Sequence, residues 1–338
     1  MHCVIESVRC SFATTGAGFA FAPAMTAELI ILAGATGDLG GRLAAMLLAR
    51  GARVRAIVRR GSAPDKVAEL RKLDLATLEV DFTSAADLRK AFAGGTCVVS
   101  ALSGLREVIV DTQSLLLNAA VAAGVPRFIP SDYCIDFTKL PPGTNRNLDL
   151  RREFHERLAK APIAATSIFN GAFTDMLTGQ APIILFKFKR VLYWENADQL
   201  MDFTTRDDTA AFTAAAALDA ETPRFLRVAG DQISARGLAA AASAVTGETF
   251  RVVRGGGLGR LGRVIKVART LFPAPTSLYP PWQGMQYLHN MFSGVAKLHP
   301  LNNDRYPGMR WTPVRAVLAT HEEKLAAERE SDHAGSKA

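Results

Sequence analysis

The chain has 338 residues, of which 49% are hydrophobic and 21% are charged, and its formal net charge is +8. This length allows a large core and one or two domains, and the composition is typical of a globular protein. No apolar run approaches the roughly 20 residues of a membrane-spanning helix. The four cysteines lack metal-ligand spacing, so we expect a cytoplasmic protein without a disulfide framework or a metal site.

Residues 1–24 differ in character from the rest of the chain. The stretch from Phe12 to Ala24 is softly apolar and resembles the core and cleavage site of a signal peptide. Met25 comes just before the first predicted strand, which favours translation from that residue. We therefore interpret residues 1–24 as a disordered extension or an upstream mis-start, with a targeting segment as the alternative.

From Leu29 onwards, apolar runs alternate with helical patterns. The predicted strands cover residues 29–33, 53–58, 76–80, 96–102, 127–130 and 164–169. The predicted helices cover residues 39–50, 64–72, 84–93, 107–123 and 148–160. Strands that alternate with helices through short links predict a parallel sheet covered on both faces. Because such crossovers are right-handed, we predict an α/β, doubly wound parallel sheet of the Rossmann type over residues 25–170.

The regular alternation weakens after Asn170. Strands are expected near residues 183–194, 224–229 and 249–253, and helices at 207–219, 235–246, 258–272 and 313–328. We assign residues 171–328 to a smaller C-terminal α/β substrate region that is interleaved with the sheet. The polar residues 329–338 are predicted to form a disordered tail.

A glycine-rich turn follows the first predicted strand. Gly34, Gly37 and Gly40 have the spacing G-x-x-G-x-x-G and lead into a helix. Glycines let a backbone turn sharply, and a helix N-terminus offers free N–H groups and a favourable dipole to a phosphate. Since a strand precedes the turn and more strand–helix units follow, the pattern predicts a dinucleotide site at the carboxyl end of the sheet.

The end of the second predicted strand indicates which dinucleotide binds. NAD enzymes usually place a carboxylate there, whereas NADP enzymes place an arginine near the additional phosphate. Here Val58 is followed by Arg59 and Arg60 with no acid nearby. A guanidinium can pair with a phosphate in a bidentate manner. We therefore favour NADP(H) over NAD(H), with Arg59 as the first choice; the alternative is that the arginines only end a strand at the surface.

A second glycine motif, Gly257–Gly262, matches G-x-G-x-x-G literally. One helix and a proline-rich stretch follow it, without a second strand unit that could complete a site. We interpret this motif as a flexible entry to a helix of residues 263–272.

Several motifs together resemble the NmrA-like and isoflavone-reductase-like atypical short-chain dehydrogenases, a family of NAD(P)-binding Rossmann proteins. They are GATGDLG at 34–40, VRR at 58–60, VSAL at 99–102, RFIPSDY at 127–133, NGAF at 170–173 and FTTRDD at 203–208. The resemblance implies that the first motif holds the pyrophosphate and that residues 100–103 lie near the nicotinamide. With the strand-end residues, the predicted cofactor-binding set is Gly34, Thr36, Gly37, Asp38, Leu39, Gly40, Arg59, Arg60, Asp81, Ser100, Ala101, Leu102 and Ser103.

The resemblance implies a catalytic lysine at the start of the helix after the fifth strand, but this chain has Arg151 there. Arginine keeps its proton, so it can hold an anion or polarise a carbonyl without transferring a proton. The Y-x-x-x-K pair of ordinary short-chain dehydrogenases is absent as well. Ser131 and Tyr133 leave the fifth strand, and His155 follows Arg151 by one helical turn. These four residues are the candidate catalytic set, although a solvated or packing role is the preferred interpretation of His155.

Two further segments suggest partners. The segment 251–269 is basic, and no acid occurs between Glu248 and Asp304. It could bind an anionic partner or form a solvated helix face, and no nucleic acid is expected. The aromatic stretch 279–292 could be an apolar lid over a small-molecule substrate, a core element or a contact of a homodimer.

Three hypotheses about function remain at this stage. The first is an NADPH-dependent oxidoreductase that reduces a small apolar or aromatic carbonyl or alkene. The second is a non-catalytic NADP(H)-sensing regulator, as the resemblance implies for NmrA itself. The third, a nucleotide-sugar epimerase or dehydratase relative, is weakened by the missing tyrosine–lysine pair. The sequence leaves the substrate and the oligomeric state open.

Overall fold

The structure is a computed structural model that describes residues 28–73 and 75–335, so the expectations for residues 1–24 and 336–338 lie outside it. Its largest sheet consists of β1 (Leu29–Ala33), β2 (Arg53–Arg59), β3 (Ala76–Val80), β4 (Cys97–Ser100), β5 (Arg127–Ile129) and β6 (Ala164–Ala165). All six strands are parallel, in the order β3-β2-β1-β4-β5-β6. The order reverses between β1 and β4, which confirms the predicted doubly wound fold.

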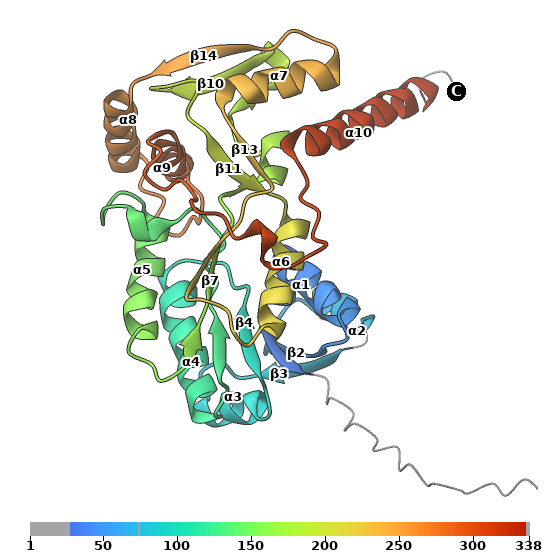
Figure 1. The fold of residues 1–338 in the computed structure, drawn as a ribbon, viewed down its shortest axis with the longest axis vertical. Helices are drawn as coiled ribbons and strands as arrows, with labels where there is room; N and C mark the ends of the chain where they lie inside the picture. Colours follow the sequence, from blue (N-terminus) through green and yellow to red (C-terminus); the bar gives the residue numbers. More distant parts are fainter. Residues whose placement is uncertain (1–27, 74, 336–338) are drawn as a thin grey trace, which may run out of the picture.

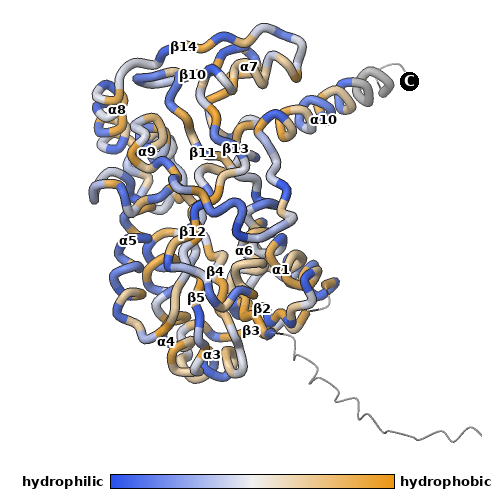
Figure 2. Tube along the Cα trace, viewed as in Figure 1, coloured by the Kyte–Doolittle hydropathy of each residue, from blue (hydrophilic) through white to orange (hydrophobic). Residues whose placement is uncertain are grey.

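Helices cover both faces of this sheet (Figure 1). They are α1 (Asp38–Ala49), α2 (Pro64–Arg71), α3 (Ala85–Phe92), α4 (Gln113–Ala122), α5 (Arg146–Leu158) and α6 (Arg206–Leu218). Ile30 of β1 packs in a core cluster with residues of α1 and α6, whereas Ile31 packs with residues of α3, α4 and α5. The central strand is therefore buried on both sides, which explains its continuous apolar run and the hydrophobic colour along the central strands in Figure 2.

The predicted strand 164–169 divides where its neighbour changes. Thr166 N donates to Phe128 O of β5 (3.1 Å), and the next amide, Ser167 N, donates to Arg224 O (2.9 Å). The second half, β7 (Ser167–Phe169), then pairs in parallel with β12 (Phe225–Arg227). Residues after 170 thus contribute both a strand and the helix α6 to the layered part of the fold.

The remaining elements form a smaller region beyond the carboxyl ends of the large sheet (Figure 1). Its strands are β8 (Ala172–Phe173), β9 (Ile184–Leu185), β10 (Arg190–Trp194), β11 (Met201–Thr204), β13 (Asp231–Ile233) and β14 (Arg251–Gly256). They form two three-stranded sheets, β14-β10-β9 and β13-β11-β8. The helices of this region are α7 (Ala235–Thr246), α8 (Leu258–Leu271), α9 (Pro281–Phe292) and α10 (Val314–Gly335). Short 3-10 helices lie at Phe137–Lys139, Thr174–Thr178, Phe186–Phe188 and Asn303–Arg305, and a π-helical segment, Glu107–Thr112, leads into α4 in the layered part of the fold.

The structure revises two sequence interpretations in this region and narrows a third. The segment 183–194 is a hairpin of β9 and β10 rather than one strand. The aromatic stretch contains α9, which begins at Pro281 and buries Trp282, Met291 and Phe292, so most of it is core. The last helix continues to Gly335 instead of ending near residue 328. Within the described residues, no helix has the length and apolar character needed to cross a membrane.

Candidate dinucleotide site

The glycine turn after β1 is dictated by backbone packing. Gly34 has φ +85°, and a Cβ there would lie 2.7 Å from the carbonyl of Ala101. A Cβ on Gly40 would lie only 2.0 Å from Gly34 O. Gly37 N donates to Gly34 O (3.0 Å), which closes the turn. Positions 34 and 40 therefore require glycine whether or not a ligand binds.

The first turn of α1 is suited to an anion. Gly37 is its N-cap and has no side chain to accept from the first N–H groups, which also lack partners within the helix. The carboxylate of Asp38 in this turn pairs with Arg42 (2.8 Å) and with Arg206 (3.2 Å). Because two guanidinium groups offset its charge, Asp38 does not oppose an approaching phosphate. The glycine cradle and the free N–H groups fit a pyrophosphate.

The two arginines after β2 differ in their surroundings. Arg59 is exposed, and it forms no ion pair with a carboxylate of residues 28–73 or 75–329, whose side chains the structure describes. Arg60 pairs with Asp87 at 3.4 Å. The carboxylate of Asp81 accepts from the hydroxyl (2.7 Å) and the N–H (2.9 Å) of Thr83, and these bonds lower its pKa. Arg59 is therefore the arginine whose charge is available to a ligand.

The ends of β1, β4 and β5 are held together beside the turn. Ala101 N donates to Ala33 O (2.8 Å), and Ser131 Oγ donates to Leu102 O (2.5 Å). Ser100 is fully buried, and its hydroxyl has no hydrogen-bond partner in the part of the chain that the structure describes. Ser103 is exposed. The fold thus brings the predicted pyrophosphate and nicotinamide segments to one edge of the sheet, at the switch point.

Arg151 lies behind this edge, on α5. Its Nε donates to Ser131 O (3.1 Å), and its Nη1 donates to Asn147 O (3.1 Å). Its Nη2 has no acceptor among the residues whose side chains the structure describes, and no carboxylate there pairs with it. Tyr287 interacts electrostatically with Arg151, and burial raises the pKa of this tyrosine. Nη2 is therefore the nitrogen of this guanidinium that has no acceptor in the described structure.

His155 lies one turn after Arg151, as predicted, but it belongs to a polar network. Its Nε2 lies 2.7 Å from Asp132 Oδ2 and 3.2 Å from Ser167 Oγ. Arg224 donates from Nη1 to Ser167 Oγ (2.6 Å), and its Nη2 lies 3.4 Å from His155 Nδ1. The ring also packs against Phe137, with 4.8 Å between centroids.

This network contains serine, histidine and aspartate but cannot act as a hydrolase triad. In a triad, the carboxylate and the nucleophile contact different ring nitrogens. Here Asp132 and Ser167 both contact Nε2 of His155, so the histidine has no second nitrogen with which to relay a proton. The other ring nitrogen, Nδ1, faces the guanidinium of Arg224 instead of a nucleophile. The arrangement suits packing of α5 against the sheet better than proton transfer.

Tyr133 points into the core instead of towards the strand ends. It is buried in the cluster that contains residues of α1 and α6, and its hydroxyl has no partner among the described residues. Burial raises its pKa, and the same holds for the neighbouring Cys134. This placement disfavours Tyr133 as a proton donor.

Asn170 is a residue that the sequence reasoning did not single out. It is fully buried just after β7, and neither atom of its side-chain amide has a partner in the described part of the molecule. Its backbone N–H donates to Cys134 O (3.1 Å). The signal in the sequence was the NGAF motif, which by itself gave no role for the asparagine.

The second glycine motif is not a dinucleotide site. The helix α8 begins at Leu258, so Gly259 and Gly262 are helical, and the interpretation of residues 257–262 as a flexible entry is wrong. Glu195 accepts from Leu258 N (3.0 Å) and so already occupies the helix N-terminus with a negative charge. A phosphate there would be repelled.

The fold and the glycine-turn geometry define a doubly wound protein of the dinucleotide-binding class. The NmrA-like family matches residues 26–265, and the chain belongs to this family. AtPrR2, solved with NADP+ and (+)pinoresinol, has a TM-score of 0.74 at 20% identity and covers 88% of this chain and 99% of its own. An NADPH-dependent quinone oxidoreductase from Escherichia coli, solved with NADPH, has a TM-score of 0.68 at 20% identity, with coverages of 86% and 99%.

A curated relative is similar over a shorter stretch. Oxidoreductase swnN of Arthroderma benhamiae is 35% identical over 103 residues, which amount to 29% of this chain. The match spans about a third of the length of that relative (32%).

Proposed function

We propose that the chain binds NADP(H) and reduces a small apolar or aromatic carbonyl or alkene. The observation that carries this proposal is the glycine turn at the switch point together with Arg59, a cation without an acid partner among the described residues. The similar solved proteins that hold NADP+ or NADPH, and the curated oxidoreductase, support the same cofactor and reaction class.

In this proposal, different site residues bind different parts of the cofactor. The turn at 34–37 and the first N–H groups of α1 hold the pyrophosphate, and Arg59 pairs with the 2′-phosphate. Residues 100–103 border the nicotinamide, where Ser131 fixes the loop through Leu102 O. NADPH, when bound, supplies the hydride.

Arg151 occupies the position at which the family's reductases have a proton-donating lysine, but it does not transfer a proton. Its free Nη2 can donate to a substrate oxygen and stabilise negative charge that develops there. The proton that completes the reduction then comes from water, because Tyr133 is buried and His155 is engaged by Asp132 and Arg224. Such a site favours substrates whose reduced oxygen is a weak base, such as quinones.

A non-catalytic NADP(H) sensor is the second candidate, and one observation favours it. The position of the family's lysine holds an arginine bonded to two backbone carbonyls, and His155, one helical turn further along α5, is already engaged by Asp132. Binding would then shift the conformation of the protein without turnover.

The cofactor assignment is tested by titrating NADPH and NADH against the wild-type protein, Arg59→Glu and Arg60→Glu. A charged hydrogen-bonded pair contributes about 1.5–3 kcal/mol, so Arg59→Glu should weaken NADPH binding roughly ten- to a hundredfold and leave NADH binding nearly unchanged. Arg60→Glu is the matched control and should have a smaller effect, since Arg60 already pairs with Asp87. Equal wild-type affinity for NADH and NADPH would contradict the role of Arg59.

The reaction is tested by NADPH oxidation with quinones, aldehydes and phenolic alkenes. We expect turnover of at least one class, lowered by Arg151→Met at unchanged NADPH affinity. Tight NADPH binding without turnover of any of these substrates would favour the sensor over the reductase.

A further inference from the structure

The helix α8 carries two apolar stripes, of which only one is used inside the protein. Leu261 and Ile265 are buried and face the body of the molecule, where α8 packs against α9. Val264, Val267 and Leu271 lie on a second stripe with the spacing i, i+3, i+7, which puts them on a common face. A helix with one buried stripe and one exposed apolar stripe presents a hydrophobic surface to something outside the fold.

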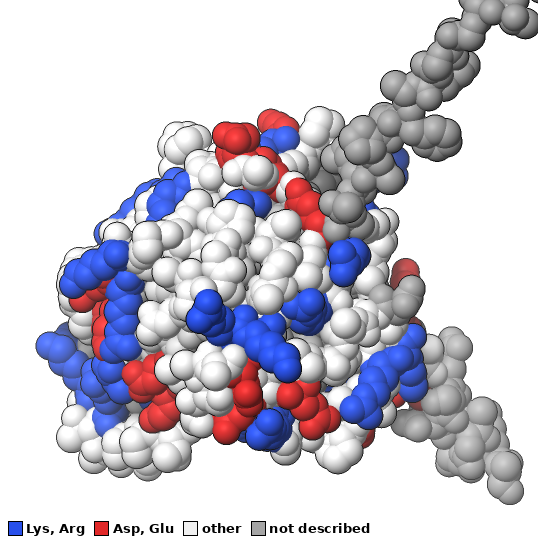
Figure 3. All heavy atoms as spheres, turned by 90° about the horizontal axis from the view of Figure 1, so that it is seen from below, with Lys and Arg blue, Asp and Glu red and all other residues white. Residues whose placement is uncertain are grey.

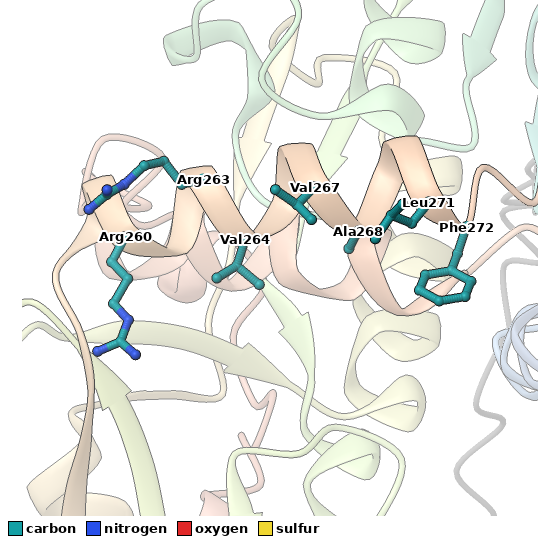
Figure 4. Close-up of a pocket in the computed structure, with 7 residues that line it drawn as sticks. All are labelled: Arg260, Arg263, Val264, Val267, Ala268, Leu271 and Phe272. Atoms are coloured by element: carbon teal, nitrogen blue, oxygen red, sulfur yellow. The ribbon is translucent and has the colours of Figure 1, made fainter.

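The second stripe is strongly exposed. The exposed fractions are 57% for Val267, 65% for Leu271 and 69% for Phe272. With Arg260 and Arg263 at one end of the helix, they line a shallow hollow of about 680 Å³ (Figure 4). All of its lining residues lie on α8 or directly after it, so the hollow cannot enclose a small ligand as a substrate pocket would. Its partner must itself be a surface.

The positive charge around this face favours an anionic partner. Arg263 and Lys266 flank the apolar stripe, and the sequence has no acid from residue 249 to residue 303. The acids that approach α8 do so away from the stripe: Glu195 caps the first turn, and Asp149 interacts with Arg269 on the α5 side. By contrast, the end of the molecule seen from below in Figure 3 carries basic and acidic groups interspersed.

We infer that α8 docks on an anionic lipid surface. An amphipathic helix with an apolar stripe and flanking arginine and lysine lies in the plane of the interface, with the stripe among the acyl chains and the cations at the headgroups. Long basic side chains reach the headgroup level while their stems stay apolar. A second copy of the chain is a poorer occupant, because the stretch from residue 249 to residue 303 carries no acid, so two copies of this face would bring together basic side chains without acidic partners from the same stretch.

None of the residues that form this surface belongs to the predicted cofactor-binding or catalytic set, so the proposal does not depend on the reductase function. The test is co-sedimentation of the full chain with vesicles of phosphatidylcholine alone and with vesicles containing phosphatidylglycerol. We expect binding to the anionic vesicles that weakens with added salt, and little binding to the neutral ones.

Two variants and a matched control locate the binding face. Val267→Asp combined with Leu271→Asp should reduce binding at least roughly tenfold, because it replaces the apolar stripe with charge. Arg263→Glu combined with Lys266→Glu should do the same, whereas Arg89→Glu combined with Lys90→Glu makes an equal charge change on the exposed face of α3. Thermal unfolding of each variant confirms that it folds.

The proposal is overturned if the wild-type protein does not bind the anionic vesicles, or if the control variant loses as much binding as the α8 variants. It is also overturned if sedimentation velocity shows a dimer that Val267→Asp with Leu271→Asp dissociates, since the stripe would then be an interface between copies.

Discussion

Gly40 and Gly41 are adjacent in α1, and the structure predicts opposite results for the same substitution. At an ordinary helical position, replacing glycine with alanine stabilises a protein by about 0.4–1 kcal/mol. Gly41→Ala should do so, because its Cβ would find the nearest atom, Ala35 O, at an ordinary 3.6 Å. Gly40→Ala would place its Cβ 2.0 Å from Gly34 O, where real contacts stay above 3.0 Å, so the turn must move by at least about 1 Å.

Such overpacking costs about 1–3 kcal/mol, so Gly40→Ala should unfold at lower urea concentration than the wild-type protein, and Gly41→Ala at higher. The shift of the turn should also weaken NADPH binding at least roughly tenfold in Gly40→Ala, because the N–H groups no longer face the pyrophosphate. Urea unfolding and NADPH titration of both variants measure the two effects. If the two variants behave alike in either assay, the packing argument for the glycine turn is wrong.

Three further predictions concern the residues behind the turn. Arg151→Lys should introduce a pH dependence of turnover that the wild-type protein lacks, measured as the pH profile of NADPH oxidation. Burial raises the pKa of Asp132, but the charge and the hydrogen bond of His155 outweigh burial, and the net result is a lowered pKa. The Asp132 carboxylate therefore stabilises the folded protein above the ordinary aspartate pKa of about 3.9, and this stabilisation is lost as the pH falls. Asp132→Asn should lower the free energy of unfolding by about 3–5 kcal/mol at pH 7 and flatten its decline in acid, measured by urea unfolding. Burial raises the pKa of Cys97 to about 12 and also raises the pKa of Cys134, so both thiols stay protonated at pH 8. A variant that retains only these two cysteines should therefore react with a thiol reagent at pH 8 only after unfolding.

The sequence predicts the layered part of the fold well because its signals are local. The apolar run of β1, the glycine turn and the helix α1 are contiguous, and each is visible without knowledge of its neighbours. The same locality explains the assignment of Arg59, since a strand end and the chemistry of the next residue suffice.

The network around His155 could not be predicted because its members come from separate elements. Asp132 follows β5, Ser167 lies in β7 and Arg224 precedes β12. The spacing along α5 correctly places His155 on the face of Arg151, yet no pattern shows that three distant side chains already engage it. The burial of Tyr133 has the same origin, because the packing of α6 covers that side of the sheet.

The ion pairs at the start of α1 limit how the chain can be divided into fragments that fold on their own. Asp38 binds Arg206, and Arg206 also pairs with Asp175 (3.6 Å) and lies over the ring of Phe173. The neighbouring Arg42 bonds to Asp207 at the start of α6. A fragment that stops at residue 170 would lack both partners and the helix that covers one face of β1. The predicted boundary at residue 170 therefore separates Asp38 and Arg42 from their ion-pair partners, and we expect neither part to fold on its own.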